Sequence, residues 1–176
     1  MDREKLEAMP VYKKAVEILH IVKNIVDLVP QDESPLADTA RHMYEDALQL
    51  APKIAGAEGG DLYDIRMENA AVIRKCARQI YVGCNGFTMY GDFKEVEYLE
   101  MLREHVEEFR VLFAEWVKTF DQYNYIIDRW GLFNPPGVNY DDKDPDDDLP
   151  FDPFEALEGF EDWDDDEEED EEEDED

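Results

Sequence analysis

The sequence predicts an all-α protein: an antiparallel, up-down four-helix bundle with a disordered, acidic C-terminal extension. Apolar residues recur at alternating intervals of three and four in four stretches, which is the seam of helices packed nearly parallel or antiparallel. No stretch alternates with a period of two, so no sheet is expected.

The net charge differs sharply between two parts of the chain. Residues 1–140 hold 24 acidic and 16 basic residues, a net of -8, whereas residues 141–176 hold 24 acidic residues and one lysine, a net of -23.

Four helices follow from four seams, taken in order along the chain. The seams consist of Val11, Ala15, Ile18, Val22, Ile25 and Val29; Leu36, Ala40, Met43, Ala47, Leu50 and Ile54; Tyr63, Met67, Ala70, Ile73, Ala77, Ile80, Cys84 and Phe87; and Val106, Phe109, Phe113, Trp116, Phe120, Tyr123, Ile127 and Trp130. The last seam predicts a fourth helix over about 93–130. Short connections between the helices favour antiparallel neighbours.

Each connection carries residues that end one helix and begin the next. PQDESP (30–35) ends the first helix and offers Asp32 or Ser34 as the N-cap of the second. The glycines at 56, 59 and 60 end the second helix, and Asp61 is placed to cap the third. TMYGD (88–92) ends the third helix, and its aspartate is expected to cap the fourth.

The glycine cluster has two interpretations, a phosphate-binding loop or a corner between helices. A phosphate loop follows a strand and supplies a lysine and a hydroxyl, whereas this cluster follows a helix and precedes Asp61 and Asp64, which repel phosphate. We therefore expect a corner, with a glycine in the left-handed conformation at the C-terminus of the helix.

Three regions are expected: a bundle at 1–130, an extension rich in proline, acid and aromatic residues at 131–160, and a polyacidic tail at 161–176. GLFNPPGV (131–138) suggests a defined conformation with its Phe and Leu packed on a helix. The last sixteen residues contain fifteen carboxylates. A segment of that composition repels itself and has no core to bury, so it is predicted to be disordered.

No catalytic constellation is apparent, so we expect a protein that is not an enzyme and has no cofactor and no metal. Glu17 and His20 have the Glu-x-x-His spacing of bundle metalloenzymes, but Ile18 lies on the apolar stripe and turns them outward. Cys76 and Cys84 lie about 12 Å apart on one predicted helix, which is too far for a disulfide. With no membrane span or signal peptide, the expected location is cytoplasmic.

Two charged features are candidates for binding. A basic stripe on the third helix could contact nucleic acid or a partner, or could simply pair with neighbouring glutamates; it consists of Arg66, Arg74, Lys75 and Arg78. The polyacidic extension could attract a basic protein, fold back on the basic stripe, or only solubilise the chain. Its predicted aromatic anchors are Phe151, Phe154, Phe160 and Trp163.

The segment PVYKKAVEILHIVKNIVDLVP (10–30) resembles the first helix of the 23S rRNA intervening-sequence proteins, a family that includes the accessory variability proteins of diversity-generating retroelements. LQLAPKIAGAEGG (48–60) resembles the family hallmark, with matching positions at Pro52, Ile54, Ala55, Glu58 and Gly59. The resemblance covers about 10–128 and implies a four-helix bundle, a ring-like homopentamer and no catalysis. The retroelement branch binds nucleic acid and a reverse transcriptase through a basic surface, whereas this domain is acidic.

Together these features predict a non-catalytic, homo-oligomeric accessory or adaptor protein that engages a basic, nucleic-acid-processing partner such as a reverse transcriptase. The alternative is a bundle that binds RNA or DNA directly and is autoinhibited by its acidic tail.

Overall fold

The protein is all-α in the part of the chain that the structure describes. The computed structural model describes residues 2–30, 32, 34–90 and 93–144, which contain five helices and no strand. The helices are α1 (Arg3–Ala8), α2 (Pro10–Asp27), α3 (Pro35–Gly60), α4 (Tyr63–Tyr90) and α5 (Val96–Val117). They belong to one compact unit, residues 1–142. None of the described helices is long and apolar enough to cross a membrane. The predicted disordered tail at 161–176 lies outside the described residues.

The starts of α2 and α3 follow from their sequences. Pro10 and Pro35 each stand in the first turn, where a missing N–H costs nothing because that group has no partner inside a helix. Ser34 is the N-cap of α3, and its Oγ accepts a hydrogen bond of 3.2 Å from the Ala37 N–H. Asp32 supports this cap, since its Oδ1 accepts from the Ser34 N–H at 3.1 Å.

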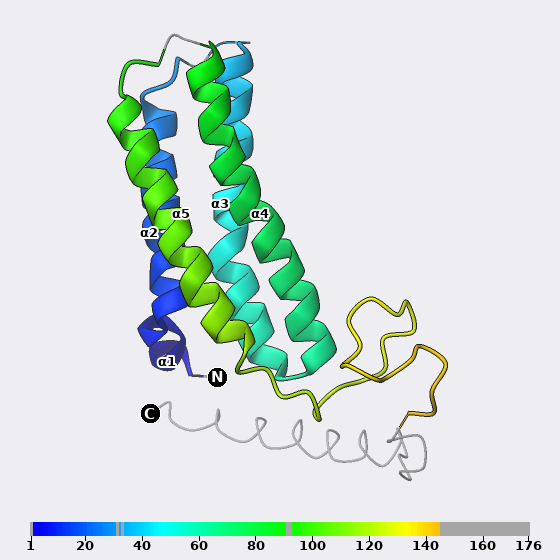
Figure 1. The fold of residues 1–176 in the computed structure, drawn as a ribbon. Helices are drawn as coiled ribbons and strands as arrows, with labels where there is room; N and C mark the ends of the chain where they lie inside the picture. Colours follow the sequence, from blue (N-terminus) through cyan, green and yellow to red (C-terminus); the bar gives the residue numbers. More distant parts are fainter. Residues whose placement is uncertain (1, 31, 33, 91–92, 145–176) are drawn as a thin grey trace, which may run out of the picture. The chain divides into compact units, whose positions relative to one another are not determined.

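The core lies between the four long helices. α3 packs against α2 and α4, and α5 packs against α2 and α4, so each long helix has two neighbours (Figure 1). Every apolar seam residue predicted for α2 and α3 is buried. In α4 the seam is buried from Ala70 to Phe87, and Tyr63 and Met67 at its start are half-buried. The short helix α1 was not predicted; it has no buried residue and packs on α2.

Gly83 of α4 lies in close contact with Met43 of α3. A Cβ added there would lie 2.5 Å from Met43 Cγ and 2.6 Å from Met43 Sδ. Met43 is buried, so these atoms have little room to move. The absence of a side chain at position 83 is therefore what allows the two helices to approach at this level.

The corner between α3 and α4 differs in detail from its prediction. All three glycines lie inside α3, and the left-handed residue is Asp61, with φ of 49°. Aspartate tolerates this conformation better than most residues because its short polar side chain can bond locally. Asp61 therefore ends α3, and α4 begins two residues later at Tyr63.

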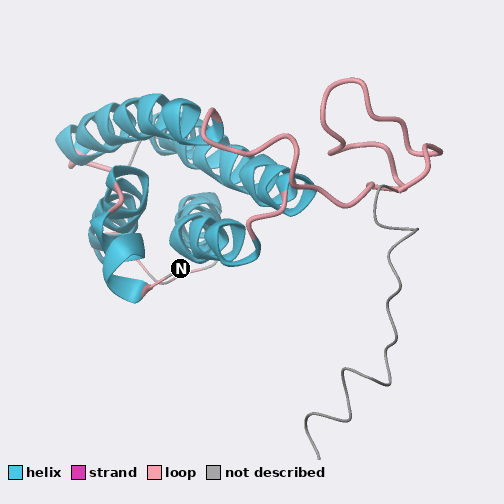
Figure 2. Cartoon of the chain, turned by 90° about the horizontal axis from the view of Figure 1, so that it is seen from below, coloured by secondary structure: helices cyan, strands magenta, loops and turns pink. Residues whose placement is uncertain are grey.

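The last helix is shorter than predicted, which corrects the expected span of 93–130. α5 begins after Glu95 and ends at Val117, and residues 118–142 form a loop (Figure 2). Thr119 Oγ1 donates to the Trp116 carbonyl at 2.7 Å, and Asp121 Oδ1 accepts from the Tyr123 N–H at 2.9 Å. Such local bonds compete with helical ones. Phe120 and Ile127 of the predicted seam are nevertheless buried.

We expect Gly83→Ala to destabilise the protein and Gly59→Ala to stabilise it. Overpacking against Met43 should cost about 1–3 kcal/mol, more than the roughly 1 kcal/mol that alanine gains in a helix. Gly59 has no atom within 4 Å of an added Cβ, so its alanine variant should gain about 0.5 kcal/mol. The midpoints of urea unfolding measure both changes, and equal shifts in the two variants would contradict the close approach at Gly83.

Candidate functional site

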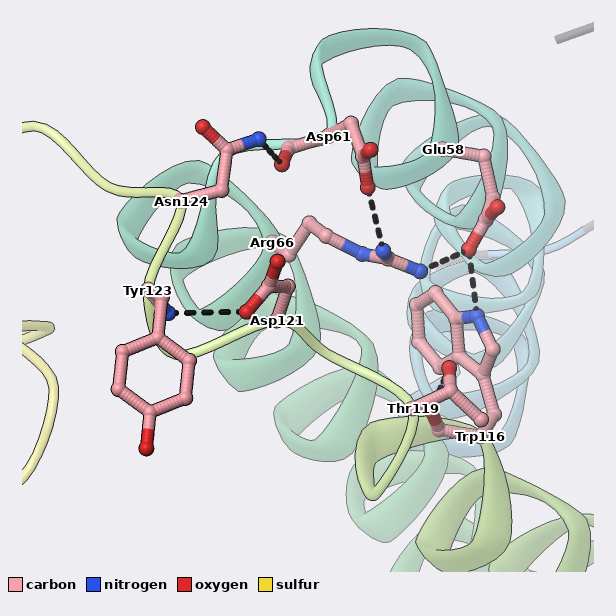
Figure 3. Close-up of polar contacts among 8 residues, drawn as sticks. All are labelled: Glu58, Asp61, Arg66, Trp116, Thr119, Asp121, Tyr123 and Asn124. Atoms are coloured by element: carbon pink, nitrogen blue, oxygen red, sulfur yellow. Dashed lines mark hydrogen bonds and ion pairs between the residues drawn. The ribbon is translucent and has the colours of Figure 1, made fainter.

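Arg66 is buried at the corner between α3 and α4, where it joins two acidic side chains. Its Nη2 donates to Glu58 Oε1 and its Nη1 donates to Asp61 Oδ1 at 2.8 Å (Figure 3). The side chains of Arg66 and Glu58 are 8% and 9% exposed, so this is a buried ion pair between α4 and α3. Asp61 is mostly exposed. The prediction placed Arg66 on a contact face, but its guanidinium is turned inward.

The same pair also holds the end of α5. Trp116 Nε1 donates to Glu58 Oε1 at 2.7 Å, so one carboxylate oxygen accepts from both α4 and α5 (Figure 3). The guanidinium carbon of Arg66 lies 4.3 Å from the centre of the Phe120 ring, within the range of a cation–π contact. Phe120 in turn meets Trp116 edge to face at 4.8 Å. Three helices are thereby joined at one buried charge pair.

The loop after α5 is hydrogen-bonded to this corner. Asn124 Nδ2 donates to the Asp61 carbonyl at 2.6 Å (Figure 3). The backbone carbonyl of Asn124 accepts from the Tyr63 N–H at 2.7 Å. Further along, the Ile126 N–H donates to Asp64 Oδ1 at 3.0 Å. These bonds give partners to the Asp61 carbonyl at the end of α3 and to the Tyr63 N–H at the start of α4, a group that no helical partner can reach. They also set where the following residues lie.

Asp128 organises the next turn of the loop. Its carboxylate accepts from the backbone N–H groups of Trp130, Leu132 and Phe133 at 2.8–2.9 Å. These bonds, first of all the one from Phe133, lower the pKa of Asp128 because they favour the ionised form. Arg129 closes the loop by donating to the carbonyls of Tyr140 and Asp142.

This loop displays large apolar side chains to solvent. Tyr123, Trp130 and Leu132 are 94%, 90% and 75% exposed. Of the predicted packing in GLFNPPGV, Phe133 is half-buried and Pro135 is buried, whereas Leu132 is not. Exposed aromatic groups on a hydrogen-bonded backbone are typical of surfaces that bind other proteins.

A hollow of about 420 Å³ lies between the loop and the first turns of α4. We call it the acidic hollow; its lining residues are Asp64, Ile65, Glu68, Asp128, Trp130, Leu132 and Phe133. Three acidic residues thus line the hollow together with an indole, a leucine and a phenylalanine. Asp64 and Asp128 also accept backbone N–H bonds from the loop. This is the chemistry that accommodates a lysine or arginine, whose alkyl stem covers apolar groups while its charge meets the acids.

A second hollow, of about 540 Å³, runs between α4 and α5. We call it the α4–α5 groove. Its apolar lining includes Ala77, Val106, Phe109, Phe113, Ala114 and Val117. Arg74, Arg78 and Arg110 line it as well, together with Glu107. The groove is therefore apolar at its base and basic at its edges.

The predicted contact residues do not share one surface. Arg74 and Arg78 meet in the α4–α5 groove, whereas Lys75 lines a different hollow beside Asp46 of α3, and Arg66 is buried. The predicted tail anchors Phe151, Phe154, Phe160 and Trp163 lie outside the described residues.

Sequence reasoning missed Arg110 and the acidic hollow. Arg110 follows the seam residue Phe109 and lies one turn before Ala114. The small side chains of Ala77 and Ala114 could have indicated a groove beside Arg110. Nothing in the sequence indicated the acidic hollow. Its lining residues at 64–68 and 128–133 come together because the loop after α5 returns to the start of α4.

The two cysteines and three histidines are the other candidates for chemistry, and within the described residues they form no reactive arrangement. Burial raises the pKa values of Cys76 and Cys84 to about 11, so both are thiols at neutral pH. His20 and His42 are exposed, and His105 Nδ1 lies 2.9 Å from the Met101 carbonyl oxygen. Among the described residues no three His, Cys, Asp or Glu side chains are grouped so as to hold a metal ion.

No family model, curated protein or solved structure matches the chain. The resemblance to the 23S rRNA intervening-sequence proteins therefore stays a prediction.

We expect Arg66→Leu to destabilise the protein by about 3–5 kcal/mol, because it leaves the Glu58 carboxylate buried with only Trp116 as a partner. Arg41→Leu is the matched control. Arg41 pairs with Asp38 on the surface, and such a pair contributes about 0–1 kcal/mol. Chemical unfolding measures both; equal costs would show that the Arg66 pair contributes no more than a surface pair.

The loop should depend on the ionised form of Asp128. Since its folded pKa is lowered, its contribution is complete above the unfolded value of about 3.9 and is lost as pH falls through the lower folded value. Asp128→Asn should speed hydrogen exchange of the Trp130, Leu132 and Phe133 amides already at neutral pH, as measured by NMR. Asp141→Asn, on an exposed residue of the same loop, should leave them unchanged.

Proposed function

We propose that the protein is a non-catalytic accessory or adaptor protein that engages a basic, nucleic-acid-processing partner such as a reverse-transcriptase-like protein. The acidic hollow carries this proposal. It combines three carboxylates with Trp130 and Leu132 on a loop that Asp128 and the α3–α4 corner hold in place. A basic side chain from the partner would enter the hollow, and exposed Tyr123 would extend the contact.

Charge supports the same kind of partner. Residues 1–140 have a net charge of -8 and the rest of the chain adds -23. Such a field steers a basic protein toward the chain over long range, while the hollow adds contacts that depend on shape. Glu68 is the best placed of its carboxylates to meet a partner, because it is exposed and its side chain makes no hydrogen bond or ion pair with any described residue.

The proposal includes an antiparallel up-down four-helix bundle that is cytoplasmic and homo-oligomeric. The pairing of α2 with α3 and α5, and of α4 with the same two helices, supports this arrangement. The resemblance to the intervening-sequence proteins supports a pentamer. Light scattering of the full chain and of a chain ending at Asp142, at low and high salt, tests the subunit number.

The alternative function is direct RNA or DNA binding by a bundle that its own acidic tail inhibits. The edges of the α4–α5 groove favour it, since Arg74 and Arg78 are exposed cations that could meet phosphates. Removing residues 143–176 distinguishes the two functions. Weaker binding of a basic protein favours the adaptor, whereas higher affinity for RNA or DNA favours the alternative.

We expect the double variant Glu68→Gln/Trp130→Ala to weaken binding of a lysine- and arginine-rich peptide by about tenfold or more, because it removes one carboxylate and the aromatic anchor of the hollow. The measurement is calorimetric titration of the chain ending at Asp142, so that the tail charge does not mask the effect. The matched control is Glu100→Gln/Tyr98→Ala, on exposed residues of α5. Equal losses in both variants would remove the acidic hollow from the proposal.

A further inference from the structure

The α4–α5 groove combines an apolar base with two arginines whose side chains have no partner among the described residues. The side chains of Arg74 and Arg78 form no ion pair or hydrogen bond with any described residue, although both are exposed one turn apart on α4. Arg110 lies on the other side and pairs only with its neighbour Glu107, at 2.8 Å. The expectation that glutamates pair with this stripe is thus unmet at Arg74 and Arg78 within the described chain.

The apolar base makes the groove a poor match for a simple anion. Phe109 is buried, while Phe113 and Val117 are half-buried beside the alanines at 77 and 114. A ligand that only paired with the arginines would leave this surface in water. An occupant that carries apolar side chains together with carboxylates would satisfy both parts of the groove.

One segment of the chain has this combination. FDPFEALEGF (151–160) carries an apolar residue at every third position, and an acid directly follows each of the first three. The apolar residues are Phe151, Phe154, Leu157 and Phe160, and the acids are Asp152, Glu155 and Glu158. Three acids match three arginines, and ten residues in a helix would span about 15 Å, close to the roughly 16 Å between Val106 and Val117 along α5.

We propose that residues 151–160 dock in the α4–α5 groove of the same chain, with their Phe and Leu side chains on its apolar base and their carboxylates paired with Arg74, Arg78 and Arg110. Only eight residues, 143–150, separate the segment from the compact unit. A short tether of this kind gives an effective concentration in the millimolar range, so even a weak contact would be occupied.

Docking would make the tail and the groove regulate each other. A basic partner that captures the tail would uncover Arg74, Arg78 and the apolar base between α4 and α5, and a competing anionic surface at the groove would release the tail. This inference does not rest on the acidic hollow, since the groove and the hollow share no lining residue.

Hydrogen exchange of residues 151–160 in the full chain, followed by mass spectrometry, tests the proposal. We expect slow exchange in the natural chain and exchange faster by about tenfold in Arg74→Glu/Arg78→Glu, with a smaller effect of raised salt. The control Lys13→Glu/Lys75→Glu makes the same charge change at exposed residues outside the groove, and it should keep the protection. Phe154→Ser/Phe160→Ser should lose the protection without altering the charge.

The proposal would be overturned by rapid exchange in the natural chain, by equal protection in Arg74→Glu/Arg78→Glu, or by equal loss in the lysine control. Protection that disappears on dilution would assign the groove to the tail of a second copy and would also overturn it. Binding of the basic peptide is measured in the same variants. If only Glu68→Gln/Trp130→Ala loses peptide binding and residues 151–160 are unprotected in the natural chain, the adaptor function stands and the docking is rejected. If residues 151–160 are protected as expected and Glu68→Gln/Trp130→Ala binds the peptide normally, the docking stands and the role of the acidic hollow is rejected.

Discussion

Glu58 accepts hydrogen bonds from Arg66 and Trp116 through one carboxylate oxygen, and this contact joins α3, α4 and α5 at one point of the core. α3 supplies the acid, α4 the guanidinium and α5 the indole. A buried pair of charges gains little stability over apolar packing but is costly to break. We infer that the pair specifies how α4 packs on α3, because arrangements that separate Arg66 from Glu58 would leave an unpaired buried charge. Trp116 connects α5 to the same oxygen through a neutral hydrogen bond.

Both candidate surfaces, the α4–α5 groove and the acidic hollow, depend on the contact at Glu58. Trp116 lies one residue before Val117, which lines the α4–α5 groove, so the bond to Glu58 holds the adjoining end of the groove. On the other side, Phe120 covers the guanidinium and Asn124 bonds to the corner, which directs the loop toward Asp64 and creates the acidic hollow. A change at Arg66 would accordingly disturb both surfaces, whereas changes at Arg74 or Glu68 affect one each.

Sequence periodicity was sufficient for α2 and α3, because a stripe at intervals of three and four reports directly which side of a helix is buried. It was misleading after Val117. Phe120 and Ile127 continue the helical spacing and are buried, yet they reach the core from a loop. Thr119 and Asp121 form local side-chain hydrogen bonds just after the end of α5. Such bonds compete with the helical backbone bonds that the apolar pattern predicts. The prediction also put Arg66 on an exposed surface. The position of a single arginine in a helical sequence does not show whether its side chain meets solvent or a buried glutamate such as Glu58.

Both surfaces combine apolar groups with a net charge, which is negative in the acidic hollow and positive in the α4–α5 groove. Three acidic residues line the acidic hollow with Trp130 and Leu132, and three arginines line the α4–α5 groove with Phe109 and Phe113. Charge alone would attract many partners and weaken in salt, while apolar contact alone would bind without steering. Their combination requires a ligand that carries both features at matching positions. The tail segment at 151–160 has them for the groove, and a lysine or arginine with its alkyl stem has them for the hollow.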